Sequence, residues 1–272
     1  NECAVFHDIQ LKPKRMAPGC LRHVFYRANA HGRQSKGNTK ALRGAGRDAL
    51  ARFEREAVAL GKLRHPAIVP LRGYFPEGPA VVLEWMAGGS LADLLEQGTI
   101  SPARAAEIAC AVLGALSEAH RRGILHRDIK PANVLFDAAG AAHLADFGTA
   151  HVADAAATVT AGVIGTLAYM APEQRAGAAA NARSDIYGVG ALLWHALTDA
   201  PPANAAPFLS GGLSEPARAL ARRLIGAESG RPESAVDARD LILALTWPTQ
   251  QPARPSTGGP PSSRRASSRD GR

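Results

Sequence analysis

The residues that could carry chemistry lie in two short segments, residues 126–135 and 146–148. The first contains Asp128 and Asn133, and the second opens with Asp146. Two short apolar runs with Gly140 between them connect the segments, and such runs are typical of a β-hairpin. A hairpin would return Asp146 to the side of Asp128. Two carboxylates and a carboxamide would then converge, and this oxygen-rich set suits Mg²⁺ carrying a nucleotide phosphate.

These segments resemble the H-R-D-x-x-x-x-N and D-F-G motifs of eukaryotic-type Ser/Thr protein kinases, the bacterial branch in particular. The resemblance implies that Asp128 accepts the proton of the attacking hydroxyl and that Lys130 steadies the γ-phosphate of ATP. It also implies that Asn133 and Asp146 hold Mg²⁺. The alternative, a charged and solvated turn, explains two motifs in this order and spacing poorly.

Further along the chain, residues 171–173 match the A-P-E motif of the same family. The resemblance gives Thr166 a hydrogen bond toward Asp128 and Lys130, which lie in the catalytic loop (residues 126–133), and it pairs Glu173 with Arg231. It also makes Thr158 and Thr160 possible autophosphorylation sites, because they precede the segment that the family usually modifies. Two surface threonines on a loop are the alternative.

A helix is expected to open at residues 184–188 and to run through Trp194 and Leu197. Asp185 near its start would brace the backbone of the catalytic loop. Earlier helices are indicated by a capping box at Ser90 and by Ser101 followed by Pro102. The helix that opens at Ser101 carries an apolar stripe of core type and is expected to run to Gly123. An amphipathic pattern also predicts a helix over residues 48–63.

The glycine-rich loop that covers the phosphates in this family is poorly matched. If Val24 is the valine of G-x-G-x-x-G-x-V, the three glycine positions hold Ala17, Gly19 and Arg22. A β-carbon at two of these positions limits how closely the backbone can approach a pyrophosphate. This departure puts the phosphate lid in doubt.

Lys40 is the best candidate for the strand lysine of the family, and Lys36 is a second choice. The preceding Asn38 and Thr39 are polar where the family has small apolar residues, so an ordinary surface lysine remains the alternative. The resemblance pairs the strand lysine with Glu56 on the predicted helix.

A buried strand is expected from residue 80 to residue 86, and it resembles the hinge between the two kinase lobes. Leu83 would be the gatekeeper, while the backbones of Glu84 and Met86 would bond adenine. The resemblance adds Val24 and Leu135 to the nucleotide contacts. A plain core strand is the other interpretation, and both can hold.

Composition limits the remaining choices for the 272-residue chain. Residues 1–47 carry a net charge of +8 and residues 248–272 carry +4, so the part between them is −4. A nucleic-acid-binding fold would spread its charge over a folded face, so no nucleic-acid partner is expected. Three cysteines lack ligand or disulfide spacing, and no membrane span is visible, which favours the cytoplasm.

We therefore predict an α+β, two-lobed, protein-kinase-like fold. Residues 1–84 form a small β-rich lobe with one helix, in which residues 1–19 are poorly defined. Residues 85–247 form the hinge and a larger, mainly helical lobe, and residues 248–272 form a disordered tail rich in Pro, Ser and Arg. The expected activity is ATP- and Mg²⁺-dependent phosphorylation of Ser or Thr in protein substrates in bacterial signalling. The alternative is a pseudokinase or scaffold with a degenerate glycine-rich loop.

Overall fold

The computed structural model describes residues 22–30, 33–41, 54, 57–58, 60–75, 80–98, 100–147, 167–202 and 213–250. For the two strands between residues 22 and 41, the description covers the backbone only.

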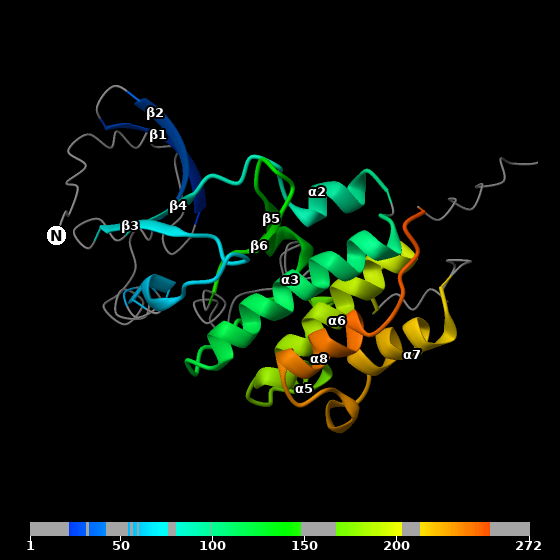
Figure 1. Cartoon of the computed structure of the whole chain (residues 1–272). Coiled ribbons are helices and arrows are strands. Elements are labelled where there is room, and N and C mark those ends of the chain that lie inside the picture. Colours follow the sequence, from blue (N-terminus) through cyan, green and yellow to red (C-terminus); the bar gives the residue numbers. More distant parts are fainter. Residues whose placement is uncertain are drawn as a thin grey trace, which may run out of the picture.

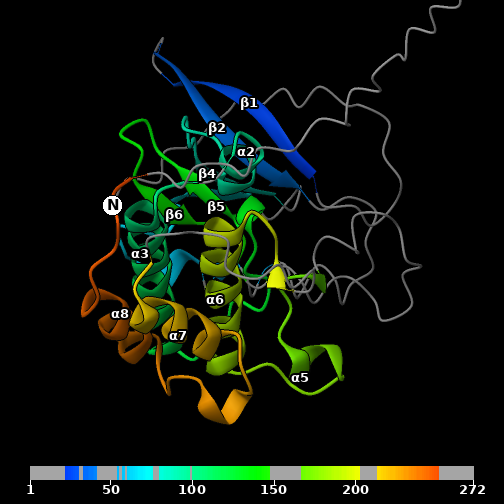
Figure 2. The same cartoon turned by 90° about the vertical axis from the view of Figure 1, so that its right-hand side faces the viewer.

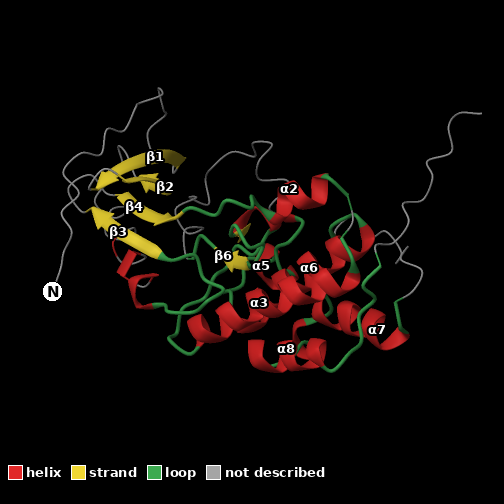
Figure 3. Cartoon of the chain, turned by 45° about the horizontal axis from the view of Figure 1, so that its top comes forward, coloured by secondary structure: helices red, strands yellow, loops and turns green. Residues whose placement is uncertain are grey.

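Four strands form an antiparallel sheet at one end of the molecule, and helices fill the other end (Figures 1 and 3). The order in the sheet is β1-β2-β4-β3. These strands are β1 (Arg22–Ala30), β2 (Arg33–Ala41), β3 (Leu71–Phe75) and β4 (Ala80–Glu84). In β4, Val81 and Leu83 are buried while Val82 between them is half-buried, which is the alternation expected of a strand.

The helical part is built around two long helices, α3 and α6, which run side by side (Figure 2). Its α-helices among the described residues include α2 (Leu91–Glu96), α3 (Pro102–His120), α5 (Pro172–Arg175), α6 (Ala182–Thr198), α7 (Glu215–Leu224) and α8 (Ala235–Leu243). The same part of the chain contains the short 3₁₀ helices η1 (Pro131–Asn133) and η4 (Glu228–Gly230).

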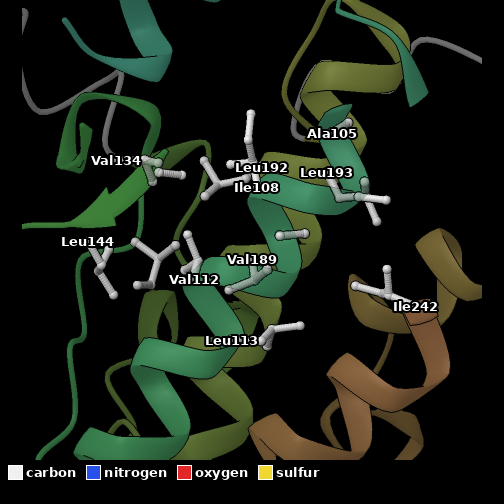
Figure 4. Close-up of a cluster of buried hydrophobic side chains, with 14 of the residues drawn as sticks. Ala105, Ile108, Val112, Leu113, Val134, Leu144, Val189, Leu192, Leu193 and Ile242 are labelled. Atoms are coloured by element: carbon white, nitrogen blue, oxygen red, sulfur yellow. The ribbon is translucent and has the colours of Figure 1, made fainter. Parts of the chain in front are cut away.

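The main core lies between these two helices and the elements around them. Ile108 and Val112 of α3 face Val189 and Leu192 of α6, with Ile242 of α8 beyond them (Figure 4). Their spacing of three or four residues places them on one stripe of each helix. Truncating such a buried side chain to alanine typically costs about 2–5 kcal/mol, so this core fixes the platform that carries the site.

The predicted helix starts are confirmed. Ser90 Oγ accepts from the backbone N–H of Asp93 at 3.2 Å, and the Asp93 carboxylate accepts in return from the Ser90 N–H at 2.8 Å. Ser101 caps α3, and Pro102 occupies the first turn. The end of α3 differs from the prediction, because the helix ends at His120. Gly123 lies in the following turn at φ +73°, where a residue without a β-carbon is favoured.

The predicted hairpin between the two chemical segments is also confirmed. Strands β5 (Val134–Phe136) and β6 (Ala142–Leu144) pair antiparallel, with Gly140 in the connecting turn at φ +81°. The hairpin lies between the sheet and the helices (Figure 3). Its second strand also bonds to the chain before β3, because the N–H of Leu144 donates to Ala67 and its carbonyl accepts from Val69, at 2.8 and 3.0 Å.

The expected fold class is confirmed: a small strand-rich part and a mainly helical remainder form a two-lobed α+β fold. The boundaries at residues 84 and 247 remain predictions. Within the predicted helix at 48–63, every residue that the structure describes up to residue 62 is helical. Among the described residues, no helix combines the length and apolar character needed to cross a bilayer.

Candidate active site

Asp128 is held from two sides within the loop that follows α3. Its Oδ2 lies 2.7 Å from Lys130 Nζ and 3.2 Å from Asn133 Nδ2. The same Asn133 amide donates to the Asp128 carbonyl at 2.8 Å. Only 13% of the Asp128 side chain is exposed, so these contacts fix the direction of a largely desolvated carboxylate. The structure therefore brings together three of the predicted catalytic residues.

Asp146 is delivered to the same place by the hairpin. The residue before it, Ala145, donates its N–H to the Asn133 carbonyl at 2.9 Å, which ties the end of β6 to the catalytic loop. Asp146 has φ 61°, and Arg127 in the catalytic loop has φ 69°. A left-handed backbone at residues other than glycine is costly and occurs most often at functional sites. Arg127 directly precedes Asp128, and Asp146 carries the second carboxylate, so both strained positions belong to the candidate site.

His126 joins the two segments through a buried imidazole. Its Nδ1 accepts from the backbone N–H of Asp128 at 3.3 Å, so Nε2 carries the proton and donates to the Ala145 carbonyl at 2.7 Å. Burial lowers the pKa of His126, which keeps the ring neutral in this role. The Phe147 ring packs edge-on against it, with centroids 4.8 Å apart. His126 thus fixes the spacing between the loop of Asp128 and the strand that leads to Asp146.

Asp185 of α6 supports the catalytic loop from below, as predicted. Its carboxylate accepts from the backbone N–H groups of His126 and Arg127 at 2.9 and 2.7 Å, and His120 Nε2 lies 2.8 Å away. The side chain is 1% exposed, and a buried carboxylate is tolerated only when donors satisfy it in this way. Sequence analysis did not identify His120, and no local pattern marks it.

Helix α6 can approach this closely because residue 188 is glycine. A β-carbon there would lie 2.6 Å from Cβ of Ile129, the residue after Asp128. The two backbones would have to separate to admit it. Gly188 therefore sets the distance between the helix that carries Asp185 and the loop that carries Asp128.

The predicted pair between Glu173 and Arg231 is confirmed. Two nitrogens of the guanidinium donate to the two carboxylate oxygens at 2.7 and 3.0 Å, and Ser184 Oγ donates at 2.8 Å. Burial alone would raise the pKa of Glu173, but hydrogen bonds from Arg231 and Ser184 outweigh it and lower the pKa to about 2. The pair anchors α5, which follows the segment expected to contact substrate.

An apolar cluster lies where the resemblance places adenine. Val69, Leu83, Met86 and Ala145 are buried together, and Leu135 packs against them. The proposed gatekeeper thus shares one cluster with two of the predicted nucleotide contacts. The cluster also includes the residue before Asp146, so it borders the catalytic segment.

The chain around the hinge contacts both the sheet and the β5–β6 hairpin. The N–H of Glu84 donates to Pro70 at 2.9 Å, and its carboxylate pairs with Arg72. The N–H of Gly88 donates to Phe136 at 2.8 Å, where a β-carbon on the glycine would lie 2.7 Å from Cβ of that residue. The chain after the hinge therefore packs directly on β5.

The backbone pairing places two of the predicted nucleotide residues within the sheet. Lys40 is paired with Val81 of β4 and His23 of β1, and Val24 is paired with Thr39. The roles of Lys40 and Val24 as nucleotide contacts remain predictions.

Several predicted residues lie outside the described part of the chain: Glu56, Thr158, Thr160 and Thr166. Their roles remain predictions. Sequence analysis also missed a contact next to the site, where the Tyr169 hydroxyl lies 2.5 Å from Nδ1 of His195. Nothing in the local sequence pattern signals that pair.

Comparison with known proteins agrees with this architecture. The family model described as "Protein kinase domain" matches residues 26–215. The chain is 43% identical over 164 residues to a probable serine/threonine-protein kinase of Corynebacterium efficiens, covering 56% of this chain and 24% of that protein. It is 42% identical over 161 residues to the serine/threonine-protein kinase PknB of Mycobacterium tuberculosis, covering 56% and 26%. The match thus spans about a quarter of these relatives.

The chain belongs to the protein kinase family. Its relatives carry the names of bacterial Ser/Thr protein kinases, as the resemblance of the motifs predicted.

Proposed function

We propose that this chain transfers the γ-phosphoryl group of ATP to Ser or Thr hydroxyls of proteins. The observation that carries the proposal is the Asp128 carboxylate, held at 2.7 Å by Lys130 and at 3.2 Å by Asn133. A carboxylate fixed in this way can accept a proton, and the lysine beside it can stabilise phosphate charge. Positioning and electrostatic stabilisation provide most of the catalysis in phosphoryl transfer.

In the proposed reaction, Asp128 accepts the proton of the attacking hydroxyl. The hydroxyl oxygen bonds to the γ-phosphorus while the bond to the β,γ-bridging oxygen breaks, which releases ADP. Lys130 offsets the negative charge on the transferred group. The backbones of Glu84 and Met86 would bond adenine, with Leu135 against its face. Lys40, in a pair with Glu56, would hold the phosphates.

The donor set fits Mg²⁺ delivered with the nucleotide. Asn133 and Asp146 supply oxygen atoms, and among the described residues no group of three or more His, Cys, Asp or Glu side chains could hold a metal. Mg²⁺ is usually held by one or two carboxylates together with substrate phosphates and water, so this sparse set is the expected one. When bound, Mg²⁺ would neutralise phosphate charge.

We also propose that the activity serves bacterial signalling in the cytoplasm, with Thr158 and Thr160 as autophosphorylation sites. The names of the relatives support the substrate class. Because the match spans about a quarter of those relatives, the specific protein substrates and partners depend on experiments with this chain.

Substitution of Asp128 by asparagine provides the test. Transfer of radiolabelled phosphate from ATP to a general protein substrate should fall by about 10²–10⁴-fold, the usual contribution of a general base. The variant should keep the melting temperature of the parent, because asparagine keeps the size of the side chain. Unchanged turnover with an intact fold would refute the assigned role.

A pseudokinase or scaffold is the second candidate, because two glycine positions of the phosphate loop hold Ala17 and Arg22. This candidate predicts a binding function that does not require ATP, and little phosphoryl transfer even in the parent chain. The residues at 128, 130, 133 and 146 favour the enzyme, since a scaffold has no chemical need for all four.

A further inference from the structure

A groove of about 740 Å³ lies beside the hinge, away from the catalytic carboxylates. Leu94, Ile100 and Phe136 give it an apolar lining, while Gly88 and Gly140 contribute backbone. Its volume is within the range of about 300–1,000 Å³ that is typical of ligand sites. Asp128 and Asp146 do not contribute to its walls, so the groove is separate from the proposed active site.

The groove also contains fixed charges. The Arg104 guanidinium lies over the Phe136 ring, 5.4 Å from its centroid, and pairs with Glu107 at 2.7 Å. At the hairpin turn, Asp137 accepts from the N–H groups of Ala141 and Ala139 at 2.8 and 2.9 Å. Hydrogen bonds from Ala141 and His143 lower the pKa of Asp137, so its carboxylate is ionised at neutral pH. An occupant with apolar residues around a cation would match this lining.

After its last helix, α8, the chain runs back toward the start of α3 (Figure 1). Trp247 Nε1 donates to the Ile242 carbonyl at 2.9 Å, and the Pro248 carbonyl accepts from the N–H of Ala103 at 2.9 Å. Thr249, the next residue, is part of the groove wall. The folded chain therefore reaches the edge of the groove at Thr249, two residues before Gln251.

We propose that residues 251–255, Gln-Pro-Ala-Arg-Pro, occupy this groove as an intramolecular clip. Two prolines favour an extended polyproline II backbone, which rises about 3.1 Å per residue and so spans about 15 Å. Pro252 and Pro255 would cover the apolar lining, and Arg254 would approach Asp137. Because the segment is tethered at Thr249, its effective concentration is in the millimolar range, and weak contacts suffice.

The clip would connect the end of the helical part to two elements that hold the proposed site. One is Gly88, two residues after Met86 of the hinge, and the other is the hairpin turn at Gly140, which leads to Asp146. Bound residues would shield the backbone of both elements. The proposal does not rest on phosphoryl transfer, so it can be tested without an activity assay.

The test is hydrogen exchange, followed by mass spectrometry, on the full 272-residue chain and on a chain ending at Gln250. The full chain should show several-fold slower exchange in residues 88–101 and 136–141, with no difference in α7. Its melting temperature should be higher by about 2–4 °C, the usual equivalent of 1 kcal/mol at this size. Equal exchange in the two chains would overturn the proposal.

Charge variants of the tail provide a matched control that cannot disturb the folded core. Pro252→Glu/Arg254→Glu/Pro255→Glu should expose the groove as truncation does. Ser263→Glu/Arg264→Glu/Ala266→Glu, with the same change in charge, should leave exchange at the level of the full chain. Protection that survives Pro252→Glu/Arg254→Glu/Pro255→Glu would assign the groove to another part of the chain. Protection that increases with protein concentration would assign it to a second copy of the chain. Either result would refute residues 251–255 as the occupant.

Discussion

Asp185 on α6 accepts a hydrogen bond from the backbone N–H of His126, 59 residues away in the sequence, at 2.9 Å. We expect Asp185→Asn to lower turnover strongly, because an amide N–H₂ would face one of the three donors that now converge on the carboxylate. An unsatisfied buried donor costs about 1–3 kcal/mol, so the melting temperature should fall as well. Asp199→Asn on the same helix is the control, since Asp199 is exposed at the helix end and asparagine tolerates its left-handed φ of 63°. Equal turnover in the two variants would contradict the bracing role.

Gly188→Ala should destabilise the chain by about 1–3 kcal/mol, the usual cost of overpacking, because its β-carbon would lie 2.6 Å from Cβ of Ile129. Turnover should fall with it, since Ile129 follows Asp128. Gly230→Ala is the matched control, because a β-carbon added at Gly230 would meet no atom within 4 Å. Urea unfolding and initial rates measure both effects. Equal stability of the two alanine variants would show that α6 can move away from the catalytic loop at little cost.

The Glu173–Arg231 pair makes stability depend on pH in the acid range. The pKa of Glu173 is about 2 in the folded chain and 4.5 in its ordinary state, so the folded chain favours the ionised form. This contribution is complete above about pH 4.5 and is lost as the pH falls toward 2. Glu173→Gln should flatten the loss of stability over this window. At neutral pH it should cost about 3–5 kcal/mol, because Arg231 stays buried without its counter-charge. Urea unfolding between pH 7 and 2.5 measures both, and an unchanged slope would refute the linkage.

Lys40→Met should lower phosphoryl transfer by about 10²-fold, the scale of losing one electrostatic stabiliser in an active site. Lys36→Met should have little effect. The register supports this contrast. Lys40 of β2 is paired with both β1 and β4, whereas Lys36 is paired with β1 and precedes the β2–β4 pairing, which starts at Gly37. Steady-state rates with ATP decide the matter. Equal and mild losses would mean that neither lysine serves the phosphates, and the scaffold candidate would then lead.

Local motifs indicated which residues would lie together in the candidate site, because these residues are close in sequence. Asp128, Lys130 and Asn133 share one loop, and the hairpin that brings Asp146 to them was readable from two apolar runs and Gly140. The resemblance to the family predicted the longer links, Asp185 to the catalytic loop and Glu173 to Arg231.

Other contacts could not be read in this way. His120 meets Asp185 across 65 residues, and Tyr169 meets His195 across 26, so no window of the sequence contains both partners.

The long-range bonds that define the site also determine when it can form during folding. The N–H of Leu144 reaches back to Ala67, His126 reaches forward 59 residues to Asp185, and Arg231 reaches back 58 residues to Glu173. Closing such long loops costs entropy before any contact compensates, so contacts of this kind form late. Helix α3 can therefore form while the carboxylates are still apart, and a refolding chain should regain helical structure before it regains a working site.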